Sequence, residues 1–275
     1  MIYVTKANGE KEKFDPRKIK KSVLEAGASV ELAREAIKKV EQEKYNNMST
    51  DKILDVTLNS LKKDRGVVAR YDLKRAIMQL GPTGFPFERY FALVLKEHGY
   101  EVEVGNVLSG ENITHEIDIV ARRSQYHMIE CKYHNNMGIK TRVKVPLYIY
   151  ARFLDVKKHG FDAPWVATNT KCTADVINYA QGVGMRITTW NYPEEYSLKK
   201  LISTKKLYPI TVLRCVGRNA KERLFECDIY LIKSLFETDI STLIKKTGFN
   251  EKYLHRILNE ARHILDGEKK TTVNR

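Results

Sequence analysis

The chain has few cysteines and no long apolar segment, and both absences exclude whole classes of protein. Its 275 residues include four cysteines, and no two of them form a CxxC pair. This argues against a zinc ribbon or a disulfide framework and fits a reducing compartment. No stretch approaches the roughly 18 apolar residues of a membrane span. The first residues, "MIYVTKANGEKEKF", lack an apolar signal core, so we expect a cytoplasmic protein without a membrane partner.

The sequence also lacks two common motifs of nucleotide and metal chemistry. There is no GxxxxGK[ST] loop, so a P-loop ATPase is not expected, and the histidines form no HxxxH or HxH pair. What is present in excess is positive charge, with a net charge of +14. A polyanion is the first partner to expect, because binding to phosphates releases counterions. A solvated lysine-rich surface is the alternative.

The hydrophobic pattern divides the chain into three segments, which we predict to be domains at residues 1–82, 84–195 and 205–266. The first opens with a hairpin that turns at Asn8 and Gly9 and continues with four helical patterns, the last beginning with "LKRAIMQL". The second alternates helix and strand, with an antiparallel run followed by a strand–helix–strand unit whose strands are parallel. The third is a small helical unit. We therefore predict an α/β multidomain protein with a central mixed sheet flanked by helices.

Two helices are expected to flank the central sheet. The apolar face of the first is predicted at Phe87, Tyr90, Phe91, Val94 and Leu95. The second begins near Pro146, and its apolar face is predicted at Leu147, Tyr150, Ala151 and Leu154.

Charged residues interrupt two expected strands in "HEIDIVARRSQYHMIECKY", residues 115–133. Adjacent strands lie ~4.8 Å apart, so Asp118 and Glu130 converge if their registers match. Glu130 and Lys132 point to one face of their strand, and Cys131 points to the other. Converging carboxylates repel unless a cation lies between them, and hard oxygen ligands suit Mg²⁺ or Mn²⁺. An adjacent lysine would serve a water attacking a phosphodiester; a simple ion pair of Glu130 with Lys132 or Arg122 is the alternative.

Glu88 lies on the helix before the sheet, on the flank shared with Phe91, Ala92 and Leu95. A glutamate there would point towards the catalytic edge of the sheet. The alternative is an ordinary first-turn acid that the helix dipole favours.

Together, "GFPFERYFALVLKEHGYEVEV", "HEIDIVA" and "YHMIECKYH" resemble the Mrr-like branch of the PD-(D/E)xK restriction-endonuclease superfamily, over residues 84–193. The resemblance implies a restriction-endonuclease-like sheet and a Mg²⁺- or Mn²⁺-dependent, type IV restriction-like endodeoxyribonuclease. It also implies catalytic roles for Glu88, Asp118, Glu130 and Lys132, with Asp118 and Glu130 holding the metal. Relatives often carry a glutamine or another polar group on the helix after the lysine strand; this helix offers Tyr148 and Arg152 instead.

Residues 1–82 resemble an ATP cone, the regulatory nucleotide-binding module of ribonucleotide reductases and their repressors. The resemblance rests on the opening motif with Lys6, Gly9 and Phe14, and on the later "STDKI" and "YDLKR". It implies that ATP or dATP binds as a regulatory ligand, without hydrolysis, at Val4, Lys6, Glu12, Lys18, Thr50 and Arg75. On charge alone, a solvated hairpin is the alternative.

The C-terminal segment "DISTLIKKTGFNEKYLHRILNEARHIL" has two helices joined by a short glycine turn. It resembles both a helix-turn-helix and a helix-hairpin-helix unit, which implies DNA contacts from Lys245, Lys246, Lys252 and Arg256. A packing or dimerisation unit is the alternative.

These observations favour a metal-dependent DNA endonuclease, regulated by adenine nucleotide and acting in restriction or defence. Cutting both strands needs two active sites, so a homodimer or higher homo-oligomer is expected. The alternatives are a nucleotide-responsive DNA-binding regulator without cleavage and a structure-specific repair or resolvase nuclease.

Overall fold

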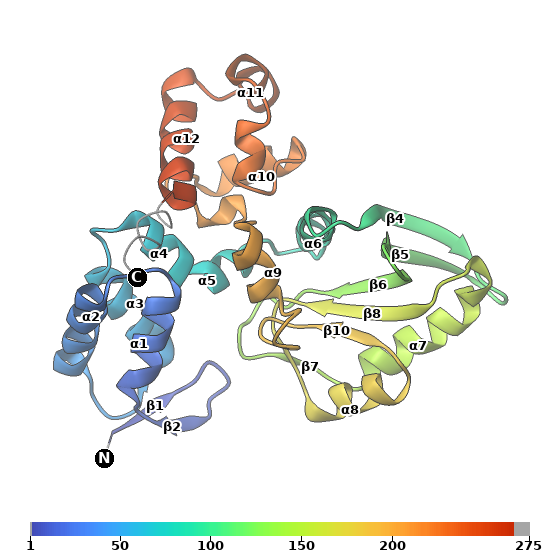
Figure 1. Ribbon diagram of the computed structural model, residues 1–275, viewed down its shortest axis with the longest axis horizontal. Coiled ribbons are helices and arrows are strands. Elements are labelled where there is room, and N and C mark those ends of the chain that lie inside the picture. Colours follow the sequence, from blue (N-terminus) through green and yellow to red (C-terminus); the bar gives the residue numbers. More distant parts are fainter. Residues whose placement is uncertain (1, 267–275) are drawn as a thin grey trace. The chain divides into compact units, whose positions relative to one another are not determined.

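A computed structural model describes residues 2–266 and divides the chain into two compact units (Figure 1). Unit 2 comprises Ile77–Tyr208. Unit 1 combines the residues before Ile77 with those from Pro209 onwards. Unit 1 is thus built from two chain segments, which correspond to the first and third segments of the sequence pattern.

The N-terminal segment of unit 1 joins a small sheet to a group of helices. The predicted hairpin is formed by β1 (Tyr3–Thr5) and β2 (Lys11–Lys13), which are antiparallel, and Gly9 takes the positive φ of +84° that its turn requires. A third strand that the sequence pattern did not predict, β3 (Met48–Ser49), runs parallel to β1. Two residues are too few to show an alternating pattern.

The helices of this segment begin at residues that cap them. Asp15, Ser29 and Ser49 each accept a hydrogen bond from a backbone N–H in the first turn of the following helix. These helices are α1 (Pro16–Glu25), α2 (Val30–Glu43), α3 (Thr50–Ser60), α4 (Arg65–Tyr71) and α5 (Leu73–Ile77).

The prediction of four helices in this segment is wrong, because a further helix, α4, precedes the predicted one. Asp64 caps α4 by accepting a hydrogen bond from Val67 N at 3.0 Å. The predicted helix is the short α5, which ends at Ile77 and not at Leu80.

The C-terminal segment of unit 1 is helical, as predicted. Asp239 caps α11, and Gly248, the residue after its last turn, has φ +66°. Asn250 accepts a hydrogen bond from Tyr253 N at 2.8 Å at the start of α12. The elements are η2 (Ile210–Val212), α10 (Arg218–Glu226), η3 (Lys233–Phe236), α11 (Ile240–Thr247) and α12 (Glu251–Asp266).

Within unit 1, α12 packs against α4, so the two chain segments share one packed body (Figure 1). Arg70 of α4 donates to the backbone oxygens of Ala26 and Ile264 at 2.7 and 3.3 Å. The buried Glu260 of α12 accepts hydrogen bonds from the backbone N–H groups of Arg214 and Cys215 at 2.9 and 3.0 Å.

Unit 2 has a five-stranded mixed sheet in the order β10-β8-β6-β5-β4 (Figure 1). The predicted antiparallel run is formed by β4 (Glu101–Ser109), β5 (Thr114–Arg122) and β6 (Tyr126–Lys132). The predicted parallel pair is formed by β8 (Ala163–Thr168) and β10 (Arg186–Thr188), and β8 also runs parallel to β6.

Helices cover this sheet, and a small parallel pair lies beside it. The helices are α6 (Phe85–Glu97), α7 (Lys144–Val156), η1 (Lys157–His159), α8 (Ala174–Gly182) and α9 (Leu198–Lys205). The pair consists of β7 (Lys140–Thr141) and β9 (Lys171–Cys172), and neither strand was predicted from the sequence. The five apolar residues predicted on α6 are all buried.

The prediction of the buried face of α7 is wrong. Leu147 and Leu154 are 46% and 49% exposed, whereas Ile149, Phe153 and Val156 are buried in the sheet core. Both sets recur at helical spacing, so the sequence pattern did not distinguish them. The face with Phe153 packs on the sheet, and it also carries the buried Arg152.

Candidate functional site

The ends of β5 and β6 bring Asp118, Glu130 and Lys132 together in unit 2. The two strands pair Ile119 with Ile129, and Asp118 and Glu130 follow at the next step of this register. Cys131 N donates to Asp118 Oδ2 at 2.7 Å, and Lys132 Nζ lies 2.6 Å from Glu130 Oε1. The convergence expected from strand alternation is therefore present.

Burial and neighbouring carboxylates raise the pKa values of two acids in this cluster. Burial and, secondly, the charge of Glu130 raise the pKa of Asp118 to about 6. Burial, then the charges of Asp118 and Glu130, raise the pKa of Glu88 to about 7. Glu88 of α6 therefore lies within the field of the sheet carboxylates, although it is also an acid in the first turn of its helix. Glu116 of β5 raises the pKa of Glu88 further, a contribution that the sequence pattern did not indicate.

Arg152 of α7, which the sequence offers with Tyr148 in place of the polar group of relatives, is a main component of the cluster. Its Nη1 donates to Glu130 Oε2, and its Nη2 donates to the backbone oxygen of Glu116. Its Nε is buried without a hydrogen-bond partner among the residues that the structure describes. Each carboxylate oxygen of Glu130 is thus paired with a cationic side chain, one with Lys132 and the other with Arg152. The alternative of an ion pair between Glu130 and Lys132 is also realised.

The cluster meets some requirements of a divalent-cation site and not others. Carboxylate oxygens are the hard ligands that Mg²⁺ and Mn²⁺ prefer, and several carboxylates lie close together here, since neighbouring acids add to the effect of burial on the pKa values of Glu88 and Asp118. Within residues 2–266, however, no group of three or more His, Cys, Asp or Glu side chains is arranged to hold a metal ion. The residues fit a cation held by Asp118 and Glu130 only if Arg152 releases Glu130.

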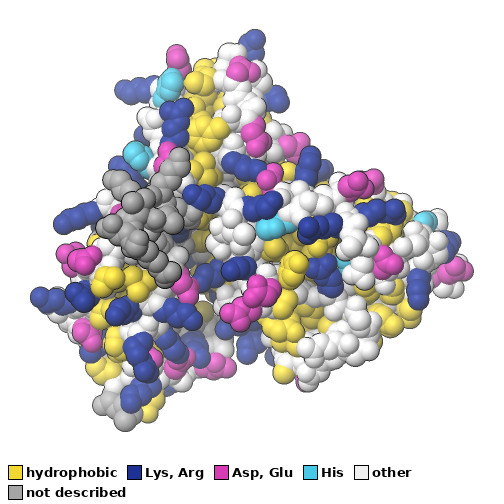
Figure 2. Space-filling model, viewed as in Figure 1, with side chains coloured by type: hydrophobic (Ala, Val, Ile, Leu, Met, Phe, Trp, Pro, Cys, Tyr) yellow, Lys and Arg dark blue, Asp and Glu magenta, His cyan; other side chains and the backbone are white. Residues whose placement is uncertain are grey.

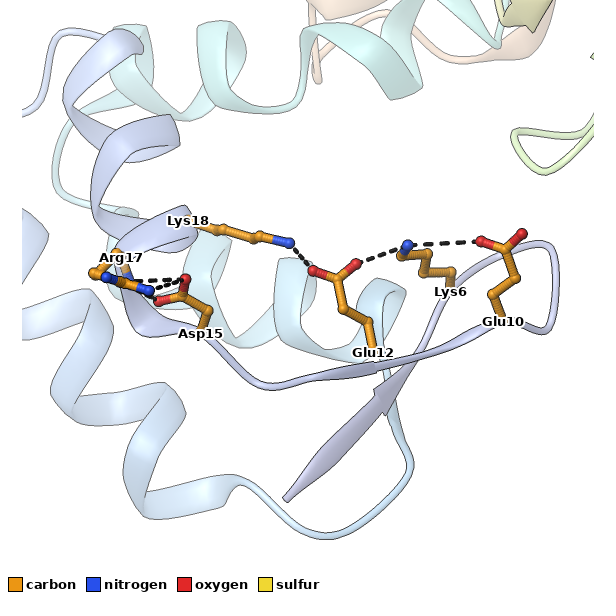
Figure 3. Close-up of polar contacts among 6 residues, drawn as sticks. All are labelled: Lys6, Glu10, Glu12, Asp15, Arg17 and Lys18. Carbon is orange, nitrogen blue, oxygen red and sulfur yellow. Dashed lines mark hydrogen bonds and ion pairs between the residues drawn. The ribbon is translucent and has the colours of Figure 1, made fainter. Parts of the chain in front are cut away.

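A second cluster lies on the N-terminal hairpin (Figure 3). Glu12 of β2 is placed between two cations, with Nζ of Lys6, the residue after β1, at 2.7 Å and Lys18 Nζ of α1 in direct contact. Lys6 Nζ is also 3.6 Å from Glu10. Asp15 and Arg17 form a separate pair at the start of α1.

The other residues predicted to bind nucleotide divide between this cluster and another part of unit 1. Val4 is buried in β1 and pairs with Met48 of β3, so Thr50, the first residue of α3, follows a strand beside β1. Arg75 of α5 forms its closest ion pair with Asp55 at 2.8 Å, and Asp51 and Asp72 lie within 3.9 Å of it. Acidic residues thus engage Arg75, which is not joined to the two lysines.

The basic residues predicted to contact DNA are exposed on the last two helices. Lys245 and Lys246 lie in the last turn of α11, and Lys252 and Arg256 lie on α12. Arg256 covers the ring of Tyr253 at 4.9 Å. Figure 2 shows Lys and Arg side chains spread over the visible face rather than gathered in one patch.

Among the described helices, none has the length and apolar character needed to cross a membrane.

Comparison with known proteins identifies two segments of the chain. Residues 2–77 match the model of the ATP cone domain. Residues 208–265 match the model described as AF1548-like, C-terminal.

An uncharacterized protein of Archaeoglobus fulgidus is 37% identical over 175 residues, which are 63% of this chain and 99% of that protein. The crystal structure of a protein of unknown function, AF1548, shares 35% identity with a TM-score of 0.61 and covers 67% of this chain and 100% of its own.

Two other solved structures are only loosely similar. Protein VC1899 from Vibrio cholerae shares 15% identity over 70% of this chain and 54% of its own, with a TM-score of 0.32. Can2 from Sulfobacillus thermosulfidooxidans, in complex with cyclic tetra-adenylate, shares 12% identity over 72% of this chain and 64% of its own, also with a TM-score of 0.32. Similarities this low bear neither on fold nor on function.

Proposed function

The chain belongs to the AF1548-like family, and we propose that it is a metal-dependent DNA endonuclease regulated by adenine nucleotide. The observation that carries the proposal is the convergence of Asp118, Glu130 and Lys132 at the ends of adjacent strands, with Glu88 in the same electrostatic field. The order and spacing of these residues along the sequence resemble those of the PD-(D/E)xK nucleases, which supports the proposal.

In this mechanism the residues of the chain position the reaction and balance its charge. A divalent cation, when bound by Asp118 and Glu130, supplies charge neutralisation and activation of water. Lys132, held 2.6 Å from Glu130, presents its ammonium group to the negative charge that develops on the phosphate. Before a cation binds, Glu88 has a pKa of about 7 and is able to exchange a proton near neutral pH. Arg152 must leave Glu130 before the cation binds. The ion pair between Arg152 and Glu130 therefore opposes binding of the cation.

Regulation is assigned to the ATP cone. The phosphates of ATP or dATP would replace Glu12 as the partner of Lys6 and Lys18, because phosphate carries more charge than one carboxylate. Binding would bias assembly or access to the site without hydrolysis. Cleavage of both DNA strands would require two copies of unit 2, so a homodimer or higher homo-oligomer is part of the proposal.

A plasmid-cleavage assay tests the enzymatic part. Full-length protein is incubated with supercoiled DNA and Mg²⁺ or Mn²⁺, with and without ATP or dATP. We expect nicked and linear products from the parent, none from Lys132→Ala, and full activity from Lys140→Ala, which removes an exposed lysine elsewhere in unit 2. A parent that binds DNA without cutting it, or equal cleavage by Lys132→Ala, would refute the endonuclease.

Calorimetry tests the regulatory part separately. ATP and dATP are titrated into the parent and into Lys6→Ala, and we expect weaker binding to the variant because one phosphate partner is lost. A parent that binds neither nucleotide would remove the regulatory claim and leave the cleavage result untouched.

One observation favours a second candidate, a nucleotide-responsive DNA-binding regulator without cleavage. Arg152 neutralises Glu130 in the manner of a structural ion pair, and the described residues offer no group of three metal-binding side chains. DNA binding that changes with ATP but never leads to cleavage would support this candidate.

A further inference from the structure

Unit 1 contains a cavity that lies apart from the hairpin cluster of Lys6, Glu12 and Lys18. It has a volume of about 390 Å³, and its wall comes from the region of α4, the segment after η2 and α12. This volume falls in the range of ~300–1,000 Å³ that small-molecule sites occupy. Val68 and Val212 contribute apolar surface to the lining.

The lining of this cavity is strongly basic. Four cations from three distant parts of the sequence line it, namely Lys62, Arg65, Arg214 and Arg256. None of the four forms an ion pair within 4 Å in the described part of the chain. Like charges repel, so four cations around one cavity create a positive electrostatic potential there. A bound anion would neutralise it.

The acidic group in the lining does not cancel this charge. Glu260 already accepts hydrogen bonds from the backbone N–H groups of Arg214 and Cys215. Burial, then the neighbouring Glu260, raise the pKa of the Cys215 thiol to about 12, so the sulfur remains neutral. Asp72, which does not line the cavity, also interacts electrostatically with Arg214. Within the lining itself, one carboxylate faces four cations.

A wider groove of about 740 Å³ shares Arg65, Arg256 and Glu260 with this cavity. It adds hydrogen-bonding groups from α12 and the residues before it, including Asn250, Tyr253 and Asn259. A ligand with its charged end in the cavity would have room and polar partners for the remainder of its structure.

We infer that this cavity binds a small ligand of nucleotide size that carries at least two phosphates. Arginine presents a planar fork of donors that matches phosphate oxygens, and three of the four cations are arginines. Arg65 lies in the ATP-cone segment, whereas Arg214 and Arg256 lie in the AF1548-like segment. The ligand would therefore bind both family segments at once, at a site separate from the hairpin lysines.

Calorimetry with inorganic tripolyphosphate on the full-length protein tests this site. We expect binding to the parent, and binding weakened by roughly tenfold or more in the double variant Arg65→Gln/Arg256→Gln. The matched control is Arg262→Gln, which removes the same charge from α12 at a position that does not line the cavity. Made in the background of Lys6→Ala, which removes a proposed phosphate partner of the cone, the same double change should cause the same loss, and this separates the cavity from the proposed nucleotide site.

Three outcomes would overturn the inference. They are a parent that does not bind tripolyphosphate, equal binding by the parent and the double variant, and equal losses in the double variant and Arg262→Gln. A parallel titration with a short DNA duplex covers the other source of phosphate. If the double variant loses duplex binding and keeps tripolyphosphate binding, the cavity contacts the DNA backbone and the inference fails. The replaced side chains are exposed, so we expect unchanged melting of the variants by circular dichroism.

Discussion

Arg152 illustrates how one side chain determines the state of a whole cluster. It is 8% exposed and joins Glu130 to the backbone of Glu116. A buried ion pair adds little stability over apolar packing, but removal of one partner leaves an uncompensated charge. Arg152 therefore stabilises unit 2, and the same contact blocks the access of a cation to Glu130.

Replacement of Arg152 by alanine should destabilise unit 2. We expect a loss of ~3 kcal/mol, at the low end for a broken buried pair, because Lys132 still contacts Glu130. Urea unfolding followed by tryptophan fluorescence reports on unit 2, since Trp165 and Trp190 both lie in it. Arg122→Ala, an exposed arginine of the same unit, is the control. The second change Glu130→Gln should restore part of the loss; an undiminished loss would contradict this account.

The same variant tests the metal site without any assay of activity. With Arg152 absent, Asp118 and Glu130 are more available to a cation, so Mn²⁺ should raise the melting temperature of Arg152→Ala by more than that of the parent. Tryptophan fluorescence on heating measures both. Equal shifts, or none in either protein, would show that these carboxylates do not bind the ion.

Glu88 should make unit 2 less stable as the pH rises. Its pKa in the folded state is about 7, against an ordinary value of 4.5, so the folded protein binds more protons than the unfolded chain between these pH values. Stability from this group is present below pH 4.5 and is lost as the pH rises through 7. Glu88→Gln should thus raise the melting temperature by a few degrees at pH 8 and leave it almost unchanged at pH 4. The exposed Glu101→Gln serves as the control, and a shift that is the same at both pH values would contradict the prediction.

At the scale of elements, Asp155 ties the β4–β5 connection to α7. Its carboxylate accepts hydrogen bonds from Asn112 N at 2.9 Å and Ile113 N at 3.3 Å, and it lies 2.7 Å from His115 Nε2. Although burial opposes the shift, the hydrogen bonds from His115 and Asn112 lower the pKa of Asp155 to about 2. One carboxylate thereby holds the strand connection on the helix.

The contribution of Asp155 should disappear in acid. A lowered pKa in the folded state stabilises the protein above the ordinary value of 3.8, and this stability is lost as the pH falls towards 2. Asp155→Asn should lower the melting temperature of unit 2 at pH 7 and flatten its dependence on pH between 4 and 2. Asp175→Asn, an exposed first-turn acid of α8, is the control. A variant as acid-sensitive as the parent would contradict this role.

The sequence predicted those elements whose pattern is both periodic and long. Alternation along β5 and β6 placed Asp118 and Glu130 together, and the apolar stripe of α6 placed Glu88 on the correct flank. α7 carries two apolar stripes, so its pattern predicted the wrong face. The resemblance named Arg152 with Tyr148, but the pattern did not predict its contact with Glu130. The two-residue strands β3, β7 and β9 are too short to produce a pattern. The four cations of the cavity come from positions up to 194 residues apart in the numbering, and no local rule joins such positions.

At the scale of the whole molecule, the distribution of tryptophan allows the two units to be followed separately. Adenine nucleotide should stabilise unit 1, because a ligand that binds only the folded state adds to its stability. Far-ultraviolet circular dichroism reports the helices and strands of both units. We therefore expect ATP to raise the part of its transition that tryptophan fluorescence does not share, and to leave the tryptophan transition of unit 2 unchanged. Lys6→Ala should reduce the first effect, whereas the exposed Lys38→Ala on α2 should not. An equal ATP shift in both signals would show that the nucleotide does not act on unit 1 alone.

The packing of α12 on α4 imposes an order on the making of the protein. Chains leave the ribosome from the N-terminus and domains fold as units, yet the surface of α4 that α12 covers must wait until all of Ile77–Tyr208 has been synthesised. Unit 2 can fold from continuous chain during that interval. The N-terminal segment of unit 1 therefore exposes the uncovered surface of α4 during synthesis. A ribosome that stalls before α12 leaves a folded unit 2 attached to a unit 1 that lacks this helix.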